Sequence, residues 1–379
     1  MHDLKTPEGV LAYLKGTRFS ASNVQTLLGG YSAFIYRVAL DVPLESGEKT
    51  MVIKHFERLC ARMEGTGADD NVERGEHEYK ALSAIAASGL FDSDSIVQLP
   101  RPIDYDQETH TIFMHDLGSP IPLAQVLEKG FSDNVSLEPN LMSNQRYKLA
   151  SDIGRALGDF VGRFHNWSVL PNQATIHAYF AQKPDWERKI VSARRPFLTL
   201  SADRFGARES WMDEFIAKEE HEASELINGG VLVMGDCSLH NILVSPPSGG
   251  RDMRIYLTDL EVARISCPEV DIGELTASAV SFELLYYPGV NYPFIPALHQ
   301  AYSFHRTLNA RRIGAMTGTD LMRFGPIFPW ARGRDEAELR KVAMAGLELW
   351  KTSIEEVDYS VKASPFVRNL FSRESQLPN

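Results

Sequence analysis

Cysteine is scarce in this sequence of 379 residues. The three cysteines, Cys60, Cys237 and Cys267, lie far apart, and their spacing fits neither a disulfide framework nor a set of zinc ligands. Reduced thiols are expected, which favours a cytoplasmic protein. The first residues lack the basic start and apolar run of a secretory signal, and no apolar stretch approaches the roughly 18 residues of a membrane-spanning helix. We therefore expect neither secretion by that route nor a membrane partner.

Basic residues are outnumbered by acidic ones. The sequence has 39 Lys and Arg against 50 Asp and Glu, a net charge of -11, and no dense basic block relieves it locally. Such a chain repels a phosphate backbone, so a nucleic-acid partner is not expected. Hydrophobic residues make up 44% and charged residues 23%, which is typical of a globular protein with a substantial core. Repeats and low-complexity tracts are lacking, and at roughly 150 residues per domain the length predicts two or three domains or lobes.

Strand-like segments dominate the first hundred or so residues. Residues 34–40 and 51–56 are β-branched and aromatic runs joined by a polar turn, which predicts a hairpin. A helix is predicted over 72–87, where apolar residues recur at helical spacing, and further strands at 96–99 and 111–114. This part of the chain therefore has the pattern of a sheet with one helix.

Helical periodicity takes over after residue 115, and we place a lobe boundary there. The first lobe, residues 1–115, is expected to be β-rich, and the second, residues 116–379, mainly helical. One long amphipathic helix is predicted to end near His165. A short hairpin of 242–244 with 255–257 is the exception within the helical lobe. The predicted fold class is α+β.

The most informative pattern is Asp236 followed, after four residues, by Asn241. This is the spacing of a kinase catalytic loop, in which the Asp receives or orients the proton of the attacking hydroxyl and the Asn holds a magnesium ion. Asp and Asn are common in turns, so the spacing alone is weak evidence. The predicted hairpin would bring Asn241 next to Asp259, however, so that two hard oxygen ligands converge as Mg²⁺ prefers.

Two upstream features fit a phosphate-binding site. Gly29, Gly30 and Ser32 lie between an apolar segment and a strand, as a phosphate-covering loop would, although two adjacent glycines also fit an ordinary turn. Lys54 ends a strand, where it is either a phosphate-pairing lysine or a solvated edge-strand lysine.

Glu78 lies on the apolar face of the predicted helix 72–87. An unpaired carboxylate there would cost on the order of several kcal/mol, so a buried cation is implied. Lys54 is the candidate partner, which would give the lysine–glutamate pair that positions ATP phosphates in kinases. Arg74, one turn earlier, is the structural alternative.

Several short segments occur in one order along about residues 20 to 280. They are Gly29-Gly30 with Tyr36-Arg37-Val38, Val52-Ile53-Lys54, Arg74-x3-Glu78-x2-Ala81-Leu82, Phe113-Met114-His115-Asp116-Leu117-Gly118, Gly235-Asp236-x4-Asn241-Ile242-Leu243, Asp259-x-Glu261 and Asp271-Ile272-Gly273. In this order they resemble the aminoglycoside phosphotransferase and choline kinase-like superfamily. Within it the chain is most similar to the 5-methylthioribose kinase-like branch, which includes fungal 4-hydroxytryptamine kinase.

The resemblance implies a two-lobed, protein-kinase-like fold with ATP and Mg²⁺ as cofactors, whose first lobe covers the nucleotide. By position, Asp236 would be the catalytic base, and Lys54 with Glu78 would clamp the phosphates. Asn241 and Asp259 would hold the metal. The cofactor-binding residues implied are Gly29, Gly30, Ser32, Lys54 and the hinge residues Met114, Asp116 and Leu117. Glu261 would either be a further metal ligand or a hydrogen-bonding support.

Some positions near the loop depart from the superfamily pattern. Met234 stands where most relatives have His or Arg, and Leu260 where they have an aromatic residue, which questions the rigidity of the loop more than its chemistry. Cys237 is either a reactive thiol or a small packing residue. His240 either contacts substrate phosphate or is hydrogen-bonded within the loop. His165 is expected to brace the loop.

The sequence is interpreted as that of an ATP- and Mg²⁺-dependent phosphotransferase, a kinase that phosphorylates a hydroxyl of a small molecule. An amine-bearing or aromatic metabolite of secondary metabolism is the candidate acceptor class. The aromatic and proline-rich segments 286–289, 291–294 and 325–330 are either walls of the acceptor pocket or plain core packing. The alternatives are a non-catalytic nucleotide-binding pseudokinase and a kinase-fold enzyme with a non-kinase reaction. A monomer is expected.

Overall fold

In the computed structural model the chain divides into two compact units. Unit 1 comprises residues 1–93, 98–120 and 258–262, and unit 2 comprises residues 94–97, 121–257 and 263–379. The predicted lobe boundary after residue 115 stays a prediction. The residues that the structure describes are 2–27, 32–57, 71–92, 94–131, 139–222, 229–248, 252–355 and 358–372.

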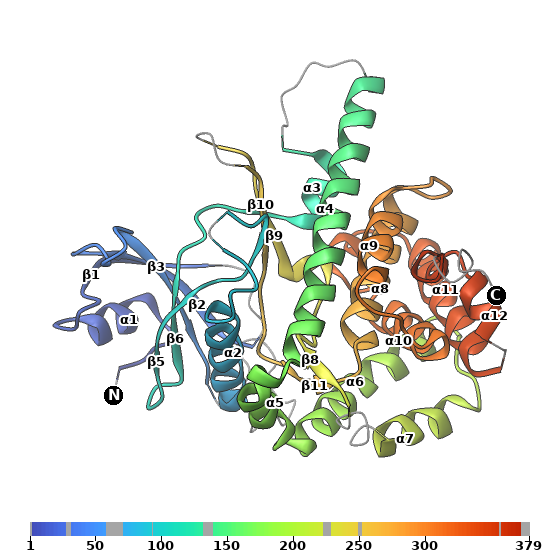
Figure 1. Cartoon of the computed structure of the whole chain (residues 1–379), viewed down its shortest axis with the longest axis horizontal. Helices are drawn as coiled ribbons and strands as arrows, with labels where there is room; N and C mark the ends of the chain where they lie inside the picture. Colours follow the sequence, from blue (N-terminus) through green and yellow to red (C-terminus); the bar gives the residue numbers. More distant parts are fainter. Residues whose placement is uncertain are drawn as a thin grey trace. The chain divides into compact units, whose positions relative to one another are not determined.

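Unit 1 is built on an antiparallel sheet whose described strands lie in the order β1-β2-β3-β6-β5 (Figure 1). Its elements are α1 (Pro7–Leu14), β1 (Ala21–Thr26), β2 (Phe34–Leu40), β3 (Thr50–His55), α2 (Asn71–Ala86), β5 (Pro102–Asp106) and β6 (Thr111–His115). The hairpin predicted at 34–40 and 51–56 is β2 with β3, and the helix predicted over 72–87 is α2. Apolar alternation was too weak to reveal β1 and β5, whose residues are at most half-buried.

The two faces of this sheet have different partners. Met51 and Ile53 of β3 join a hydrophobic core with Val10 and Leu14 of α1. Neighbouring residues of a strand point to opposite faces, so Lys54 is turned away from that core. Lys54 therefore lies on the opposite face of the sheet, where it is buried, with 2% of its surface exposed.

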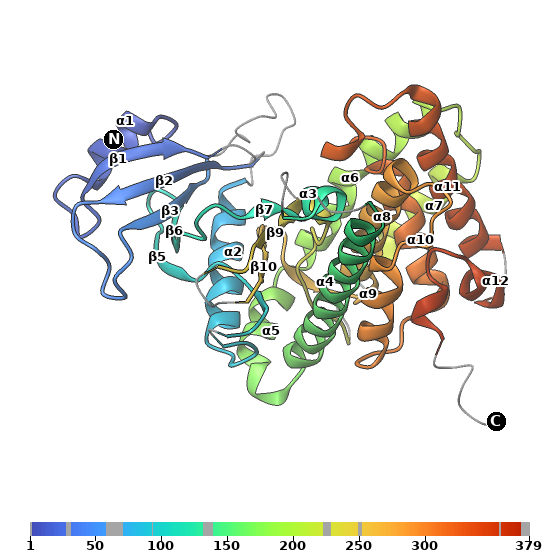
Figure 2. The ribbon, with the colours of Figure 1, turned by 90° about the horizontal axis from the view of Figure 1, so that it is seen from above.

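Unit 2 is mainly helical, and the predicted α+β class is confirmed (Figure 2). Its helices are α3 (Leu123–Lys129), α4 (Pro139–Ser168), α5 (Ala174–Ala181), α6 (Pro184–Arg204), α7 (Met212–Glu222), α8 (Glu269–Tyr286), α9 (Phe294–Ser303), α10 (Ala310–Arg323), α11 (Glu336–Glu355) and α12 (Asp358–Ala363). Its short strands are β4 (Val97–Gln98), β7 (Ile121–Pro122), β8 (Val231–Val233), β9 (Ile242–Ser245), β10 (Arg254–Leu257) and β11 (Arg264–Ser266). The predicted hairpin is β9 with β10, in which Ile242 lies opposite Leu257. None of the described helices combines the length and the apolarity needed to cross a membrane.

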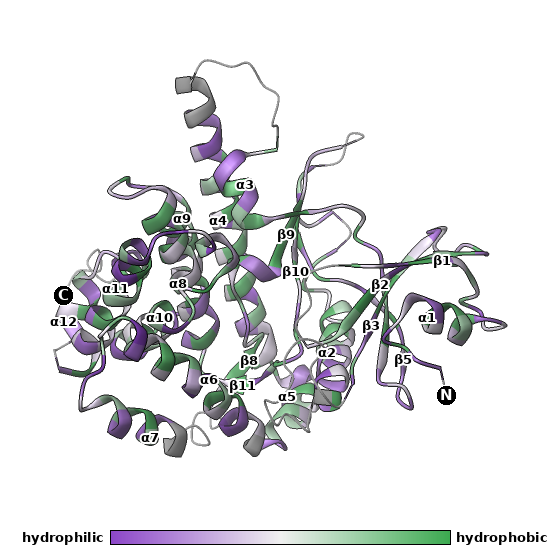
Figure 3. Ribbon diagram, turned by 180° about the vertical axis from the view of Figure 1, so that it is seen from behind, coloured by the Kyte–Doolittle hydropathy of each residue, from purple (hydrophilic) through white to green (hydrophobic). Residues whose placement is uncertain are grey.

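Helix α8 is the interior helix of unit 2, in contact with α9, α10 and α11. All its residues from Glu269 to Phe282 are buried. Helix α11, which has an exposed face, alternates hydrophobic and hydrophilic stretches, as Figure 3 shows, whereas a helix buried on every side has no solvent-facing side. The polar side chains of α8 therefore need partners inside the protein. Ser281 donates to the carbonyl of Gly325 at 2.8 Å, for example.

The segment 291–294 belongs to the core of unit 2. Phe294 and Tyr292 are at most 1% exposed. The Tyr292 hydroxyl donates to the carbonyl oxygen of Leu127 at 2.9 Å, and Tyr287 stacks on Tyr292 and donates to the same oxygen at 3.0 Å. Tyr292 and Phe294 are thus packed in the core, while the pocket-wall interpretation of this segment stays a prediction.

Helices α10 and α11 approach so closely that glycine is required at their contact. A Cβ atom at Gly318 would lie 2.6 Å from the backbone nitrogen of Trp350, and one at Gly346 would lie 2.5 Å from that of Met322. Overpacking of this kind costs about 1–3 kcal/mol, so Gly318→Val should lower the melting temperature by at least about 3 °C. The matched control is Glu348→Val at an exposed position of α11, which should melt like the wild type. Equal melting of both variants would contradict the close approach.

His299 gives the stability of the protein a dependence on pH. It is fully buried, with its Nε2 atom 2.8 Å from the Thr276 hydroxyl, and burial lowers the pKa of His299 to about 3. An unfolded histidine titrates near about 6.5, so below that pH the unfolded chain gains a proton that the folded chain does not. Stability is therefore lost as pH falls, by up to about 1.4 kcal/mol per pH unit.

The variant His299→Gln isolates this effect. The free energy of unfolding, measured with urea between pH 7 and pH 5, should fall less steeply with decreasing pH in the variant than in the wild type. Equal slopes would show that His299 already takes up a proton in the folded protein.

Candidate active site

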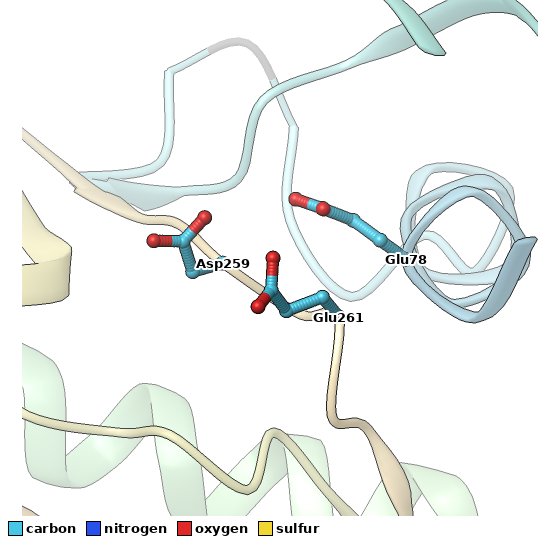
Figure 4. Close-up of side chains that lie close together, drawn as sticks. All are labelled: Glu78, Asp259 and Glu261. Atoms are coloured by element: carbon cyan, nitrogen blue, oxygen red, sulfur yellow. The ribbon is translucent and has the colours of Figure 1, made fainter. Parts of the chain in front are cut away.

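Four charged side chains meet in unit 1, and we call them the Lys54 cluster: Lys54 from β3, Glu78 from α2, and Asp259 and Glu261 from the segment after β10. The Lys54 Nζ atom lies 2.7 Å from Glu78 Oε2 and 3.1 Å from Glu261 Oε2, and it donates to Asp259. Figure 4 shows Glu78 reaching from its helix toward the other two carboxylates. Lys54 is therefore the partner of Glu78, whereas Arg74 pairs with Glu261 at 3.1 Å.

The charges of this cluster shift the pKa values of its members. Burial disfavours the charged form of Lys54, but the carboxylates of Asp259, Glu78 and Glu261 hold the Lys54 pKa well above its usual value. Burial raises the pKa of Glu78 to about 7, against the opposing effect of Lys54. Burial also acts against ionised Glu261, yet the charges of Lys54 and Arg74 lower its pKa. Two cations thus face three carboxyl groups, which leaves the cluster able to accept a further cation.

The three carboxyl groups are also the candidate metal ligands of the described residues. Oxygen atoms of Glu78, Asp259 and Glu261 lie within 4.8 Å of one another, and such hard oxygens suit Mg²⁺. Asp259 is the most accessible, with 33% of its side chain exposed. Its backbone φ of 61° is in the left-handed region, which is uncommon outside glycine. Strained backbone of this kind gathers at functional sites.

Glu261 is held from two sides. Its Oε2 atom accepts a hydrogen bond of 2.6 Å from the Ser32 hydroxyl, and its Oε1 atom lies 3.1 Å from Arg74 Nη1. Both oxygens therefore already have partners in the chain, as a supporting carboxylate would. Gly29 and Gly30, the predicted phosphate-covering glycines, lie outside the described residues.

The predicted hinge begins at the end of β6. Met114 is buried in that strand, and Leu117 is half-buried. Asp116 accepts hydrogen bonds of 2.7 and 3.0 Å from Arg37 and one of 3.0 Å from the Gly118 N–H. Its carboxylate thus holds the chain after β6. Arg37 was missed as a functional residue, although it stands in one of the segments that carry the resemblance.

In unit 2 the predicted loop residues are in direct contact. The Asn241 amide donates to the Asp236 carbonyl at 3.0 Å and to its carboxylate Oδ2 at 2.9 Å. His240 lies 2.7 Å from the Ser238 hydroxyl, and its ring lies 5.7 Å from that of Phe328. His240 is therefore hydrogen-bonded within the loop, which was one of its two interpretations.

The carboxylate of Asp271 holds the start of this loop. It accepts the N–H groups of Met234 at 2.9 Å and of Gly235 at 2.8 Å, and it lies 3.1 Å from His165 Nε2. The other ring nitrogen of His165 lies 2.9 Å from the Tyr302 hydroxyl. Because Asp271 binds the backbone of residue 234, the loop is anchored whatever side chain stands there. The methionine at this position therefore does not loosen the loop, and His165 braces it as expected.

Glu274 is a residue that sequence reasoning missed. Its buried carboxyl group is hydrogen-bonded to Asp236, and burial together with the Asp236 charge raises the pKa of Glu274 well above its usual value. Burial opposes ionisation of Asp236 too, but His240, the hydrogen bond from Glu274 and the charge of Arg194 lower the Asp236 pKa. These opposite pKa shifts favour the proton on Glu274 rather than on Asp236, with Glu274 as the donor of the hydrogen bond between them. Glu274 is one helical turn after Asp271, so the motif around Asp271 was the signal that could have found it.

Arg194 of α6 completes this arrangement. Its Nη2 atom lies 3.2 Å from Glu274 Oε2 and donates to the Gly235 carbonyl at 2.6 Å. Cys237, next to Asp236, is 3% exposed, and burial raises the pKa of its thiol well above the usual value. Of its two interpretations, a packing residue fits the structure. The expected meeting of Asn241 in unit 2 with Asp259 in unit 1 stays a prediction.

Known proteins resemble this chain in sequence and in fold. No family model matches it. It is 24% identical over 278 residues to 4-hydroxytryptamine kinase of Psilocybe cubensis, covering 72% of each chain. It is 23% identical over 292 residues to phosphotransferase FrzJ of a Cladobotryum species, covering 70% of this chain and 71% of that one.

Among solved structures, a candidate aminoglycoside phosphotransferase from Ralstonia eutropha has a similar fold, with a TM-score of 0.51 at 14% identity. The similarity covers 94% of this chain and 99% of that one. These relatives and this fold support the assignment of the chain to the aminoglycoside phosphotransferase and choline kinase-like superfamily.

Proposed function

We propose that this protein is an ATP- and Mg²⁺-dependent kinase that phosphorylates a hydroxyl group of a small molecule. The observation that carries the proposal is the half-buried carboxyl group of Asp236, which accepts from Asn241 at 2.9 Å and is hydrogen-bonded to Glu274, with its pKa below the usual value. A carboxylate in this state can take the proton of an alcohol. Both curated relatives bear the names of phosphate-transferring enzymes, which supports the same activity here.

Asp236 acts as the base in this proposal. The alcohol oxygen attacks the γ-phosphorus of ATP, the bond from that phosphorus to the bridging oxygen of ADP breaks, and the alcohol proton goes to Asp236. Because Asn241 and Glu274 both bond to Asp236, its carboxylate does not need to reorganise during the step.

The Lys54 cluster and Asn241 hold the phosphates and the metal in this proposal. Glu78 fixes the ammonium group of Lys54, which would pair with phosphate oxygens, while Asp259 and Asn241 supply oxygen ligands. The bound metal would neutralise charge on the triphosphate. Asp259 accepts from Lys54 through Oδ1, so its Oδ2 atom is the oxygen that would bind the metal without loss of this bond.

We further propose an aromatic or amine-bearing acceptor. The segment 325–330 lies against the catalytic loop, because the Phe328 ring is 5.7 Å from His240 and stacks on Trp330 at 4.6 Å. This contact favours the pocket-wall interpretation for 325–330. The name of the relative 4-hydroxytryptamine kinase specifies an aromatic amine that bears a hydroxyl, which supports the same acceptor class.

Asp236 and Asp259 should differ in what their loss removes. Asp236→Asn should lower turnover by about 10²–10⁴-fold, the usual contribution of a general base, while ATP with Mg²⁺ still raises the melting temperature. Asp259→Asn should lose the part of that stabilisation that depends on Mg²⁺. ADP release with 4-hydroxytryptamine and related amino alcohols measures turnover.

Two outcomes would contradict this proposal. Full turnover by Asp236→Asn would remove Asp236 from the role of base. Stabilisation of the wild type by ATP and Mg²⁺ without ADP release for any acceptor would favour the pseudokinase alternative. Product mass decides against a non-kinase reaction, since only phosphorylation adds a phosphate group.

Glu274 should act through its proton. Glu274→Gln keeps a neutral donor of similar shape, so its kcat should stay within about threefold of the wild type. Glu274→Leu removes the hydrogen bond to a charged group, worth about 1.5–3 kcal/mol, and should lower kcat at least about tenfold with an unchanged KM for ATP. Equal damage by both substitutions, with wild-type melting, would mean that Glu274 is ionised in the working enzyme.

A further inference from the structure

Unit 2 contains a cavity of about 440 Å³ between α6, α7, α10 and α11. Apolar side chains of the first three helices form much of its wall, among them Ile190, Ile216 and Ala315. No residue of the predicted catalytic loop 235–241 is among its described lining residues. The cavity is therefore separate from the groups that surround Asp236, except for Arg194, which lines it and also binds the Gly235 carbonyl.

The lining carries an excess of positive charge. Seven lysine and arginine side chains but only three carboxylates line the cavity among the described residues, in a protein whose net charge is -11. Arg264 and Glu187 form a buried ion pair and neutralise each other. The remaining cations outnumber the remaining carboxylates by six to two, since each count falls by one.

The deepest cations share one carboxylate. Arg323 lies 3.2 Å and Arg194 4.0 Å from Asp320 Oδ1. Glu274 also contacts Arg194, but burial raises the pKa of Glu274, which weakens its negative charge. Asp320 is the carboxylate within ion-pair distance of both guanidinium groups, and Asp236 near Arg194 and Glu219 near Arg323 add negative charge from farther away. Charge that stays unbalanced in a buried site is unfavourable.

Arg323 shows this imbalance most directly. Its Nε atom is buried and has no hydrogen-bond partner in the described part of the chain. Burial and the neighbouring charge of Arg194 lower its pKa in spite of Asp320. Asp320 Oδ1 likewise accepts no hydrogen bond from the described residues. An anionic group with an adjacent hydroxyl would satisfy both atoms.

Further cations lie near the solvent. Arg195, Lys218, Arg311 and Arg312 are exposed lining residues. Arg311 donates to the backbone carbonyls of Ser353 and Ile354, at 3.0 and 2.5 Å. A ring of exposed cations in an otherwise acidic protein raises the local concentration of anions and steers them toward the cavity.

We propose that this cavity binds a small organic anion, with its carboxylate or phosphate between Arg194 and Arg323 and its apolar body against α6 and α7. The binding site is independent of the proposed kinase activity, because its ligand does not touch Asp236. Arg194 lines the cavity and also donates to the Gly235 carbonyl. The bound anion would therefore contact an arginine that holds the predicted catalytic loop.

Titration calorimetry with mandelate tests the proposal, since mandelate joins an aromatic ring, a hydroxyl and a carboxylate. Phenyl phosphate tests a phosphate in place of the carboxylate, and mandelamide is the uncharged control compound of the same shape as mandelate. Saturating ADP with Mg²⁺ is present throughout, so that a nucleotide site is filled. We expect one of the two anions to bind with a Kd below about 1 mM, and mandelamide at least tenfold more weakly.

The variant Arg323→Gln should weaken binding at least tenfold. Arg155→Gln is the matched control, because Arg155 is an exposed arginine on α4 with 67% of its side chain accessible, and it should bind like the wild type. Absence of binding by both anions, equal binding of mandelamide, or unchanged binding in a folded Arg323→Gln protein would each overturn the proposal.

A second measurement uses the wild-type protein and does not depend on the folding of a variant. Phenylglyoxal modifies arginine side chains, and mass spectrometry locates the modified residues. The binding anion should slow modification of Arg195 and Arg323 at least threefold and leave Arg155 unaffected. Equal modification with and without the anion would also overturn the proposal.

Discussion

The structure of the catalytic loop depends on one buried carboxylate. Asp271 accepts the backbone N–H groups of residues 234 and 235, and it can do so only because α8 is buried on every side and carries this carboxylate into the interior. A buried acid is stable when several donors converge on it. His165 provides the third contact, so that α4, α8 and the loop are fixed to one another. The position of Asp236 follows directly from this anchor, because it is the next residue after the bound Gly235.

Each unit contains a group of charged side chains in which one sign of charge outnumbers the other. In unit 1 the Lys54 cluster has more carboxyl groups than cations, and in unit 2 the cavity has more cations than carboxylates. Protonation reduces part of this imbalance, because the pKa values of Glu78 and Glu274 are both raised above that of a solvated glutamate. The remaining excess charge is negative in the Lys54 cluster and positive in the cavity of unit 2. Complementary ligands would balance each, a metal cation in unit 1 and an organic anion in unit 2.

Residues whose role follows from local periodicity could be predicted from the sequence. Glu78 lies on an apolar helix face and Lys54 at the end of a strand, so their ion pair was predictable from two local patterns. Asp236 and Asn241 were predictable from their spacing. Arg194 was not, because its partners are far away in sequence and its burial depends on helices that pack only in the folded chain. Glu274 and Arg37 stand beside motifs that the sequence shows, but their partners Asp236 and Asp116 are distant in sequence. The cavity could not be predicted either, because it is lined by two pairs of helices, and the pairs are far apart in the sequence.

The interior position of α8 also explains why the pKa of Glu274, next to Asp236, is raised. An ionised Glu274 would put two negative charges side by side, and Arg194 is shared between Glu274, Asp320 and a backbone carbonyl. Keeping the proton on Glu274 removes this repulsion and turns a competing acid into a donor. The pKa of Asp236 is lowered accordingly. The same arrangement leaves Arg194 with less negative charge than it needs, so that the state of the base and the charge of the cavity are set by one guanidinium group.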